Sequence, residues 1–267
     1  MTPAGGLRRV GVTGTTGTVG AAALAHLTQA LGAARVVALA RRPEAVGARV
    51  SRRRCDYDDV ASLYRALDGL DALLFVSSDG DADVMLRHHL NVVSAVRASG
   101  VRRVVYLSSV GADLASPFCY DRVNALTENL LADTPAEVVV VRAGLYEDFL
   151  HALMGGDRQV RLPVSGDAVL APVPRTEVGH ALAEAMLTEA GGPVRHAVGP
   201  RDRTLADIAH ERGQRLLPMT MEAYRTQLVA DGESPWWSFA YATLLEVVDA
   251  GRYASPAVTD PGATTSA

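Results

Sequence analysis

Three glycines near the start of the chain, Gly14, Gly17 and Gly20, follow one another at intervals of three residues. A short apolar run, residues 10–12, precedes them, and residues 19–31 have the pattern of a helix. Glycines at such a strand-to-helix turn let the backbone approach a phosphate closely, and the first turn of the helix offers unpaired N–H groups and partial positive charge. The sequence therefore predicts a nucleotide pyrophosphate site here, with an ordinary tight turn as the alternative.

A second apolar run, residues 36–40, ends in two arginines, Arg41 and Arg42, about twenty residues after the glycines. Sites that select NAD place an acidic residue at this point, where it accepts hydrogen bonds from the ribose 2′-hydroxyl. Two arginines can instead form charge-assisted, fork-like hydrogen bonds with a 2′-phosphate. The predicted cofactor is therefore NADPH, the alternative being a solvated arginine pair at the cap of a helix.

The composition narrows the class of protein. A chain of 267 residues with 48% hydrophobic content can form one large α/β domain, or a nucleotide-binding domain with a smaller substrate-covering portion. A net charge of -4 argues against nucleic acid as a partner. Two cysteines, Cys55 and Cys119, provide no disulfide framework, and no side-chain spacing is typical of a metal site.

No signal-peptide pattern and no apolar run of membrane-spanning length is visible in the sequence. We therefore expect a cytoplasmic protein with a small-molecule substrate and no membrane partner. The sequence leaves open whether two copies form a homodimer.

Strand-like apolar runs alternate with helical segments through the first half of the chain, which is typical of βαβ units wound about a parallel sheet. The expected strands are residues 8–13, 35–40, 50–55, 72–76, 104–108 and 138–142. The expected later helices are residues 83–98, 124–131, 176–187 and 204–212, the last with Thr204 as its cap. The sequence therefore predicts an α/β fold.

From Gly144 onward the composition changes to glycine, proline and other turn residues. We expect residues 1–143 to form the nucleotide-binding domain and residues 144–255 mainly to cover the carboxyl edge of the sheet, where ligands of open α/β sheets bind. Residues 194–198 are expected to return to the sheet as a further strand. Residues 256–267, rich in Pro, Gly, Thr and Ser, are expected to form a flexible tail.

Ordered motifs carry a family resemblance from residue 10 to residue 247. They are VTGTTGTVG at 12–20, ARRP at 40–43, DY at 56–57, LFVSS at 74–78, NVV at 91–93, GV at 100–101, TE at 127–128 and RAGLY at 142–146. On these motifs the chain resembles the NmrA-like atypical short-chain dehydrogenase/reductases, in particular the type 2 NADPH:quinone oxidoreductase and triphenylmethane reductase branches. The resemblance implies a Rossmann-like, doubly wound parallel sheet, an NADP-type cofactor, and hydride transfer to a quinone-like or conjugated carbonyl substrate.

Carried over residue by residue, the resemblance implies a cofactor site with several parts. The pyrophosphate would be lined by Gly14, Thr16, Gly17, Thr18 and Val19, and the 2′-phosphate would meet Arg41, with Arg42 beside it. Asp56 and Tyr57 would flank the adenine, although Asp56 could instead cap the following helix. The ribose next to the nicotinamide would lie over Val76, Ser77 and Ser78.

The chain departs from the family at the catalytic position. Ordinary short-chain dehydrogenases use a tyrosine whose pKa is lowered by a lysine four residues later. Here Tyr120 is followed by Asn124, the chain contains no lysine, and the histidine typical of the quinone reductase branch is also missing. The sequence therefore predicts chemistry that does not depend on a lysine-assisted tyrosine.

Reduction of a quinone or activated alkene suits such a site, because the acceptor is already electrophilic. The protein must then hold the cofactor, exclude water and place a hydrogen-bond donor at the oxygen that gains charge. We expect Tyr120 or Ser108 to be that donor, and Asn124 to orient the cofactor or substrate. The resemblance places Ser108 opposite the nicotinamide, and a half-buried aromatic at a helix start is the alternative for Tyr120.

Five aromatic side chains are candidates for a pocket that receives a flat, aromatic or conjugated substrate: Phe118, Tyr146, Phe149, Trp236 and Trp237. Burial in a core is the alternative for each of them. The sequence thus favours an NADPH-dependent reductase. An NADP-binding redox sensor without turnover and a non-redox tailoring enzyme of a natural-product pathway remain as alternatives.

Overall fold

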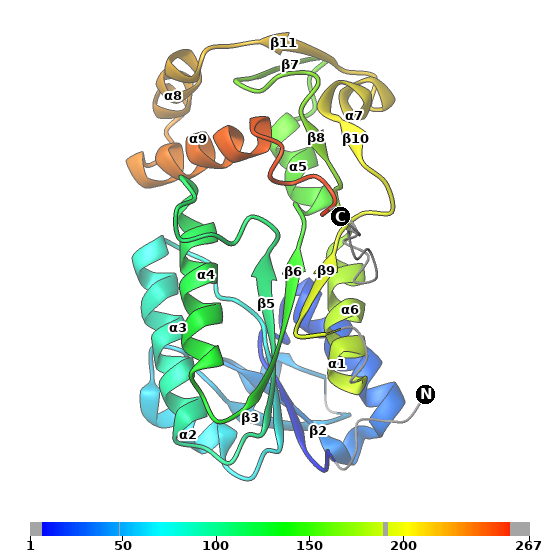
Figure 1. Ribbon diagram of the computed structural model, residues 1–267, viewed down its shortest axis with the longest axis vertical. Helices are drawn as coiled ribbons and strands as arrows, with labels where there is room; N and C mark the ends of the chain where they lie inside the picture. The colour runs from blue at the N-terminus through cyan, green and yellow to red at the C-terminus, as the bar shows by residue number, and fades with distance from the viewer. Residues whose placement is uncertain (1–6, 48, 189–191, 257–267) are drawn as a thin grey trace, which may run out of the picture.

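A seven-stranded parallel sheet forms the centre of the computed structural model, which describes residues 7–47, 49–188 and 192–256 (Figure 1). Its order is β3-β2-β1-β4-β5-β6-β9. The strands are β1 (Val10–Val12), β2 (Val36–Ala40), β3 (Ser51–Arg54), β4 (Ala72–Phe75), β5 (Arg103–Ser109), β6 (Glu137–Ala143) and β9 (Val194–Ala197). The prediction of a Rossmann-like, doubly wound α/β fold is confirmed.

Helices cover both faces of this sheet (Figure 1). One face carries α2 (Val60–Leu67), α3 (Ala82–Arg97) and α4 (Cys119–Ala132), and the other carries α1 (Thr18–Leu31) and α6 (Arg175–Leu187). Successive side chains of a strand point to opposite faces. In β5, Val104 and Tyr106 accordingly pack beneath α3 and α4, and Val105 and Leu107 pack beneath α1 and α6.

The helices α1 and α6 approach each other closely at a glycine. A Cβ atom on Gly179 would lie 2.5 Å from the carbonyl oxygen of Val19 and 2.7 Å from the Cβ of Ala22. Only glycine leaves room for this contact, because real Cβ atoms do not approach other atoms so closely. The packing fixes the start of α1, where the predicted pyrophosphate site lies.

The second portion of the chain lies at the end of the sheet toward which β5 and β6 point (Figure 1). It contains α5 (Glu147–Met154), β7 (Gln159–Leu162), β8 (Val169–Leu170), β10 (Arg203–Thr204), α7 (Leu205–Glu211), β11 (Arg215–Pro218), α8 (Met221–Ala230) and α9 (Pro235–Asp249). Two small sheets, β10-β8 and β11-β7, stabilise it together with a core of its own. The 3-10 helices Ala33–Arg35 and Pro43–Ala45 complete the elements.

Several elements differ from the expectation. The helix expected at residues 124–131 begins at Cys119. The helix expected after Asp56, for which no bounds were given, is α2, and the helices α5, α8 and α9 had not been predicted. Residues 194–197 form β9, which pairs in parallel with β6, and Thr204 accepts a hydrogen bond from the backbone N–H of Asp207 as the cap of α7. The division at residue 143 stays a prediction.

Two further observations concern the described part of the chain. None of its helices combines the length and apolar character needed to cross a membrane. Its His, Cys, Asp and Glu side chains form no group of three or more that could hold a metal ion. Of the tail expected at residues 256–267, all but Pro256 lies outside the described residues.

Candidate cofactor and substrate site

The three glycines of the first turn have different structural roles. Gly14 has a φ of 64°, and a Cβ there would lie 2.9 Å from the Cβ of Val76. A Cβ on Gly20 would lie 2.3 Å from the carbonyl oxygen of Gly14, so this glycine lets α1 pack against the turn. For Gly17 the nearest described atom, again the oxygen of Gly14, would be 3.5 Å away. Two glycines therefore shape the turn, and Gly17 leaves an open surface.

The start of α1 adjoins this open surface. Thr16, Gly17 and Thr18 are exposed. Gly17, the N-cap residue of α1, has no side chain that could accept a hydrogen bond from the first turn of the helix. The first turn also carries no acidic residue that would repel an anion. Free amide groups at a helix N-terminus bind phosphate groups, so a pyrophosphate fits this cradle.

Arg41 and Arg42 are both exposed just after β2. Neither guanidinium group forms an ion pair or hydrogen bond with any residue that the structure describes, so both charges are free to bind an anion. Arg54, on the neighbouring β3, differs because its guanidinium binds the carboxylates of Asp56 and Asp59. Arg41 and Arg42 therefore place positive charge that no described carboxylate pairs with at the tip of β2.

Asp56 and Tyr57 lie beyond the end of β3. The carboxylate of Asp56 accepts from Arg54 at 3.1 Å and from the backbone N–H of Asp58 at 3.3 Å. The cap of α2 is Asp59, which accepts from the backbone N–H of Ser62 at 3.0 Å, so the alternative of Asp56 as that cap is wrong. The Tyr57 hydroxyl donates to the carbonyl oxygen of Val76 at 3.0 Å.

Hydrogen bonds with β5 and α3 hold the loop Val76–Ser78, which is predicted to support the ribose. Ser77 donates from its hydroxyl to the carbonyl oxygen of Leu107 at 2.7 Å. The backbone N–H of Ser78 donates to Nε2 of His89 at 3.2 Å, and Nδ1 of His89 lies 2.9 Å from the Thr127 hydroxyl. Burial lowers the pKa of His89 to about 3, which keeps the ring neutral with Nε2 as an acceptor.

The hydroxyl of Ser78 is buried and has no hydrogen-bonding partner among the described residues. A buried polar group without a partner is uncommon, because its desolvation is not offset. The floor of the predicted ribose site therefore contains a donor that the protein itself leaves unused.

The two serines at the end of β5 point to different partners. The Ser108 hydroxyl donates to Glu128, whose carboxylate also binds Arg142 at 3.0 and 2.6 Å. Ser109 donates to Oδ1 of Asp121 at 2.7 Å and accepts from Nδ2 of Asn124 at 3.1 Å. Ser108 is thus directed into an ion pair beneath α4, and Ser109 lies at the carboxyl edge of the sheet.

Tyr120 and Asn124 both use their polar atoms inside the protein. The Tyr120 hydroxyl donates to the carbonyl oxygen of Gly80 at 2.5 Å, and burial raises the pKa of Tyr120 to about 12. The Oδ1 atom of Asn124 accepts from the Tyr106 hydroxyl at 2.6 Å. The catalytic roles of Tyr120, Asn124 and Ser108 stay predictions.

The sequence analysis did not identify Tyr106, Ser109 or Asp121 as residues of this edge, nor the role of His89. One signal was available, the adjacent serines Ser108 and Ser109 at the end of a strand, but the prediction selected Ser108.

Three of the five predicted aromatic residues, Phe118, Phe149 and Trp237, form one continuous row of rings together with Tyr120 and Tyr241. Ring centroids are 5.2 Å apart for Phe118 and Tyr120 and 6.4 Å apart for Tyr120 and Trp237. The row continues through Tyr241, 5.6 Å from Trp237, to Phe149, 6.3 Å further on. It connects the start of α4 with α5.

Phe149 and Tyr241 also line a groove of about 590 Å³ between α5, β7, α8 and α9. The two other candidates also pack against residues outside this row. Trp236 packs against Phe239, at 6.1 Å, and the ring of Tyr146 lies 4.0 Å beneath the guanidinium of Arg175. The structure thus connects Phe118, Phe149 and Trp237, but not Tyr146.

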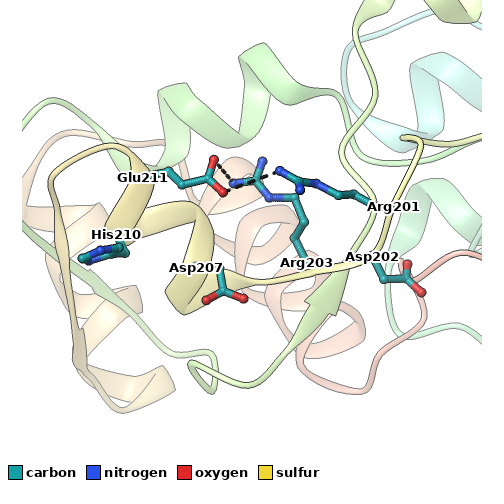
Figure 2. A pocket seen from close by; sticks show the side chains of 6 residues that line it. All are labelled: Arg201, Asp202, Arg203, Asp207, His210 and Glu211. Atoms are coloured by element: carbon teal, nitrogen blue, oxygen red, sulfur yellow. Dashed lines mark ion pairs between the residues drawn. The ribbon is translucent and has the colours of Figure 1, made fainter.

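Figure 2 shows a charged cleft to which the sequence had not pointed, where β10 meets α7. It has a volume of about 240 Å³ and is lined by Arg201, Asp202, Arg203, Asp207, His210 and Glu211. Glu211 pairs with Arg203 at 2.5 Å and lies 3.8 Å from Arg201. Three carboxylates, those of Asp202, Asp207 and Glu211, line the cleft with the two arginines, so the cleft has no excess of positive charge and is not assigned as a ligand site.

A family model described as NAD(P)H-binding matches residues 14–189, the part of the chain that contains the glycine turn and β2 to α6. The chain belongs to this NAD(P)H-binding family. Quinone oxidoreductase 2 of Escherichia coli (strain K12) is 31% identical over 210 residues, which cover 76% of this chain and 72% of that protein. An NmrA-like family domain-containing oxidoreductase of Aspergillus flavus is 30% identical over 144 residues, covering 52% of this chain and 47% of the relative.

Two solved structures have the same fold. The NADPH-dependent quinone oxidoreductase of Escherichia coli in complex with NADPH matches with a TM-score of 0.82 and 27% identity, covering 92% of this chain and 91% of that one. Triphenylmethane reductase of Citrobacter sp. in complex with NADP(H) matches with a TM-score of 0.80 and 24% identity, covering 93% and 92%, and shows the fold alone. These relatives confirm the prediction of an NmrA-like, NAD(P)H-dependent oxidoreductase.

Proposed function

We propose that this member of the NAD(P)H-binding family is an NADPH-dependent reductase that passes a hydride to a quinone-like or conjugated carbonyl compound. The observation that carries the cofactor choice is the exposed pair Arg41 and Arg42, which has no counter-charge in the described chain, beside the glycine turn. The substrate class is supported by the kinship with quinone oxidoreductase 2 and by the row of aromatic rings from α4 to α5.

Each part of the cofactor has a candidate partner. The amides at the start of α1 hold the pyrophosphate, Arg41 and Arg42 bind the 2′-phosphate, and Asp56 and Tyr57 border the adenine. The loop Val76–Ser78 supports the ribose of the nicotinamide. When bound, NADPH supplies the hydride with its electron pair.

The protein's task is then to place a flat substrate and stabilise the charge that develops on its oxygen. Residues 144–255, apart from α6 and β9, mainly form the substrate-covering portion, with Phe118, Phe149 and Trp237 as aromatic contacts and Trp236 and Tyr146 at its borders. The candidates for the hydrogen-bond donor are Tyr120 and Ser108, with Asn124 as the orienting group. Ser109 joins them because it ends β5 at the edge where such ligands bind.

The direct test is oxidation of NADPH with a panel of quinones, together with titration of both cofactors. We expect quinone-dependent turnover and a Kd for NADPH at least tenfold below that for NADH, a difference of about 1.4 kcal/mol. Equal dissociation constants would remove the cofactor assignment. For the donor, a tenfold loss of kcat in Tyr120→Phe would support Tyr120, and a change below twofold would exclude it.

A redox sensor that binds NADPH without turnover is the second candidate. Two observations favour it: the chain has no lysine, and the Tyr120 hydroxyl donates to Gly80. Tight NADPH binding with no reduction of any quinone would favour the sensor over the reductase.

A further inference from the structure

Asp121, on the first turn of α4, is a completely buried carboxyl group surrounded by hydroxyls. Its Oδ1 atom lies 2.7 Å from the Ser109 hydroxyl and 3.0 Å from that of Tyr253, and its Oδ2 atom lies 3.0 Å from the Ser116 hydroxyl. A Cβ on Gly111 would lie 2.3 Å from Oδ2, so the backbone closes the remaining side. No described arginine or histidine forms an ion pair with it.

This environment makes Asp121 a weaker acid than an ordinary aspartic acid, so its neutral form persists to higher pH. Burial raises the pKa of Asp121 more than the three hydroxyls and the positive charge of Arg252 lower it. Arg252 is itself paired with Asp113 at 2.9 Å, and Arg142, on β6, is held by Glu128. The other titratable neighbours are Tyr253, and Cys119 on the same helix turn, which are themselves weak acids.

The protonation of Asp121 decides where the single hydrogen of the Ser109 hydroxyl points. If Asp121 is a carboxylate, Ser109 donates this hydrogen to it. If Asp121 is a carboxylic acid, it can donate to Ser109, whose oxygen then accepts from both Asp121 and Asn124. The Ser109 hydrogen is then free to bind a ligand at the carboxyl edge of the sheet.

The other two hydroxyls near this edge have fixed partners. Ser108 donates to Glu128, which also carries two hydrogen bonds from Arg142, and Tyr120 donates to Gly80. Glu128 is also a carboxyl group, but it is ion-paired with Arg142, and the backbone carbonyl of Gly80 has no proton to supply. Of the three hydroxyls, only that of Ser109 contacts a carboxyl group that forms no ion pair with a described residue.

We propose that Asp121, as a carboxylic acid, supplies a proton through Ser109 to the substrate oxygen that gains charge. This inference rests on the proposed reductase function. With the hydride, the substrate gains two electrons and one hydrogen, and Ser109 forms the new O–H bond by giving up its proton. Ser109 takes the proton of Asp121, and the resulting carboxylate recovers one from water through Ser109 after the product leaves. Ser109 is thus the catalytic residue and Asp121 a positioning residue that acts through it.

The first test compares the pH dependence of kcat/KM, with a quinone as acceptor, in the wild type and three variants. In the wild type, kcat/KM falls as the pH rises through the raised pKa of Asp121, because the carboxylate draws the Ser109 hydrogen back. Asp121→Asn loses this dependence and is about tenfold slower, since an amide can donate to Ser109 but cannot give up a proton. Ser109→Ala is about 10²-fold slower. Asp133→Asn, which removes an exposed carboxylate at the far end of α4, behaves as the wild type.

A further variant separates this proposal from a purely structural role. Tyr253→Phe removes one of the donors that stabilise the carboxylate form, so it moves the fall of kcat/KM to higher pH. If Asp121→Asn does not fold, the direction of the pH shift in Tyr253→Phe still tests the proposal. A shift to lower pH, or a pH dependence that survives in Asp121→Asn, overturns the proposal.

A spectroscopic measurement is independent of turnover. The infrared difference spectrum of wild type minus Asp121→Asn, recorded as the pH is lowered, shows the C=O stretch of a protonated carboxyl group appearing at a higher pH than in an ordinary aspartic acid. If this band is missing while quinones are reduced, only the role of Asp121 falls. If the band is present and the wild type reduces no quinone, the proposed function falls, and with it the transfer of the proton to a substrate.

Discussion

The ring of His89 holds the backbone of Ser78, whose N–H donates to Nε2 at 3.2 Å. Because Nε2 accepts, Nδ1 carries the hydrogen and faces the Thr127 hydroxyl at 2.9 Å. One side chain on α3 thereby connects the predicted ribose loop to α4. The shape of that loop depends on a histidine that remains neutral.

Replacing His89 by Phe tests this support. The variant keeps an aromatic ring against Phe75 but leaves the Ser78 N–H without its partner. We expect a loss of about 1–3 kcal/mol in the free energy of unfolding, measured by urea denaturation, and a higher Kd for NADPH. His210→Phe, at an exposed position on α7, is the control and changes neither quantity.

The low pKa of His89 also predicts how the free energy of unfolding changes at acid pH. Its pKa is about 3 in the folded protein and about 6.5 when unfolded, so the unfolded chain binds the extra proton first. The stability that neutral His89 provides is present above pH 6.5 and is lost as the pH falls toward 3, by up to about 1.4 kcal/mol per pH unit. Unfolding free energies measured across this window should fall less steeply in His89→Phe. Parallel curves would contradict the assignment of a neutral ring.

The sequence predicted the βα alternation because apolar runs and helical periods are local signals. It could not predict which serine of β5 reaches the edge, since a strand buried on both faces gives no alternation and a shift of one residue reverses every side chain. The burial of Asp121 could not be predicted from the sequence for another reason. Its partner Tyr253 lies 132 residues away in the sequence, so its burial is a tertiary property.

The two glycines with different surroundings should respond differently to alanine. Gly20→Ala places a Cβ 2.3 Å from the oxygen of Gly14, so we expect a loss of about 1–3 kcal/mol in the free energy of unfolding. Gly17→Ala meets its nearest described atom at 3.5 Å, so its stability should stay within about 0.5 kcal/mol of the wild type. Its Kd for NADPH should nevertheless rise at least about tenfold, because the methyl group occupies the surface where the pyrophosphate approaches. A Gly17→Ala protein with unchanged NADPH affinity would argue against the cradle.

The arginine pair should control the choice between the two cofactors. In Arg41→Ala/Arg42→Ala, the Kd for NADPH should rise at least about tenfold, whereas that for NADH should change little, because only NADPH carries the 2′-phosphate. The matched control is Arg225→Ala, which removes an exposed arginine of α8. High salt should weaken NADPH binding in the wild type more than in the double variant. Equal losses for both cofactors would show that the arginines stabilise the fold rather than bind the phosphate.

Phe149 provides a test of the aromatic contact surface, because it both stacks on Tyr241 and lines the groove beside α5. Phe149→Ala removes ring surface that a flat acceptor would cover in both the ground state and the transition state. We therefore expect KM to rise several-fold with kcat nearly unchanged, and to rise more for a two-ring naphthoquinone than for a one-ring benzoquinone. Val229→Ala, at a position of α8 that is 60% exposed, should leave both constants unchanged. Equal effects on the two quinones would indicate that Phe149 supports the C-terminal core and does not touch the substrate, since loss of packing has no means of distinguishing one ring from two.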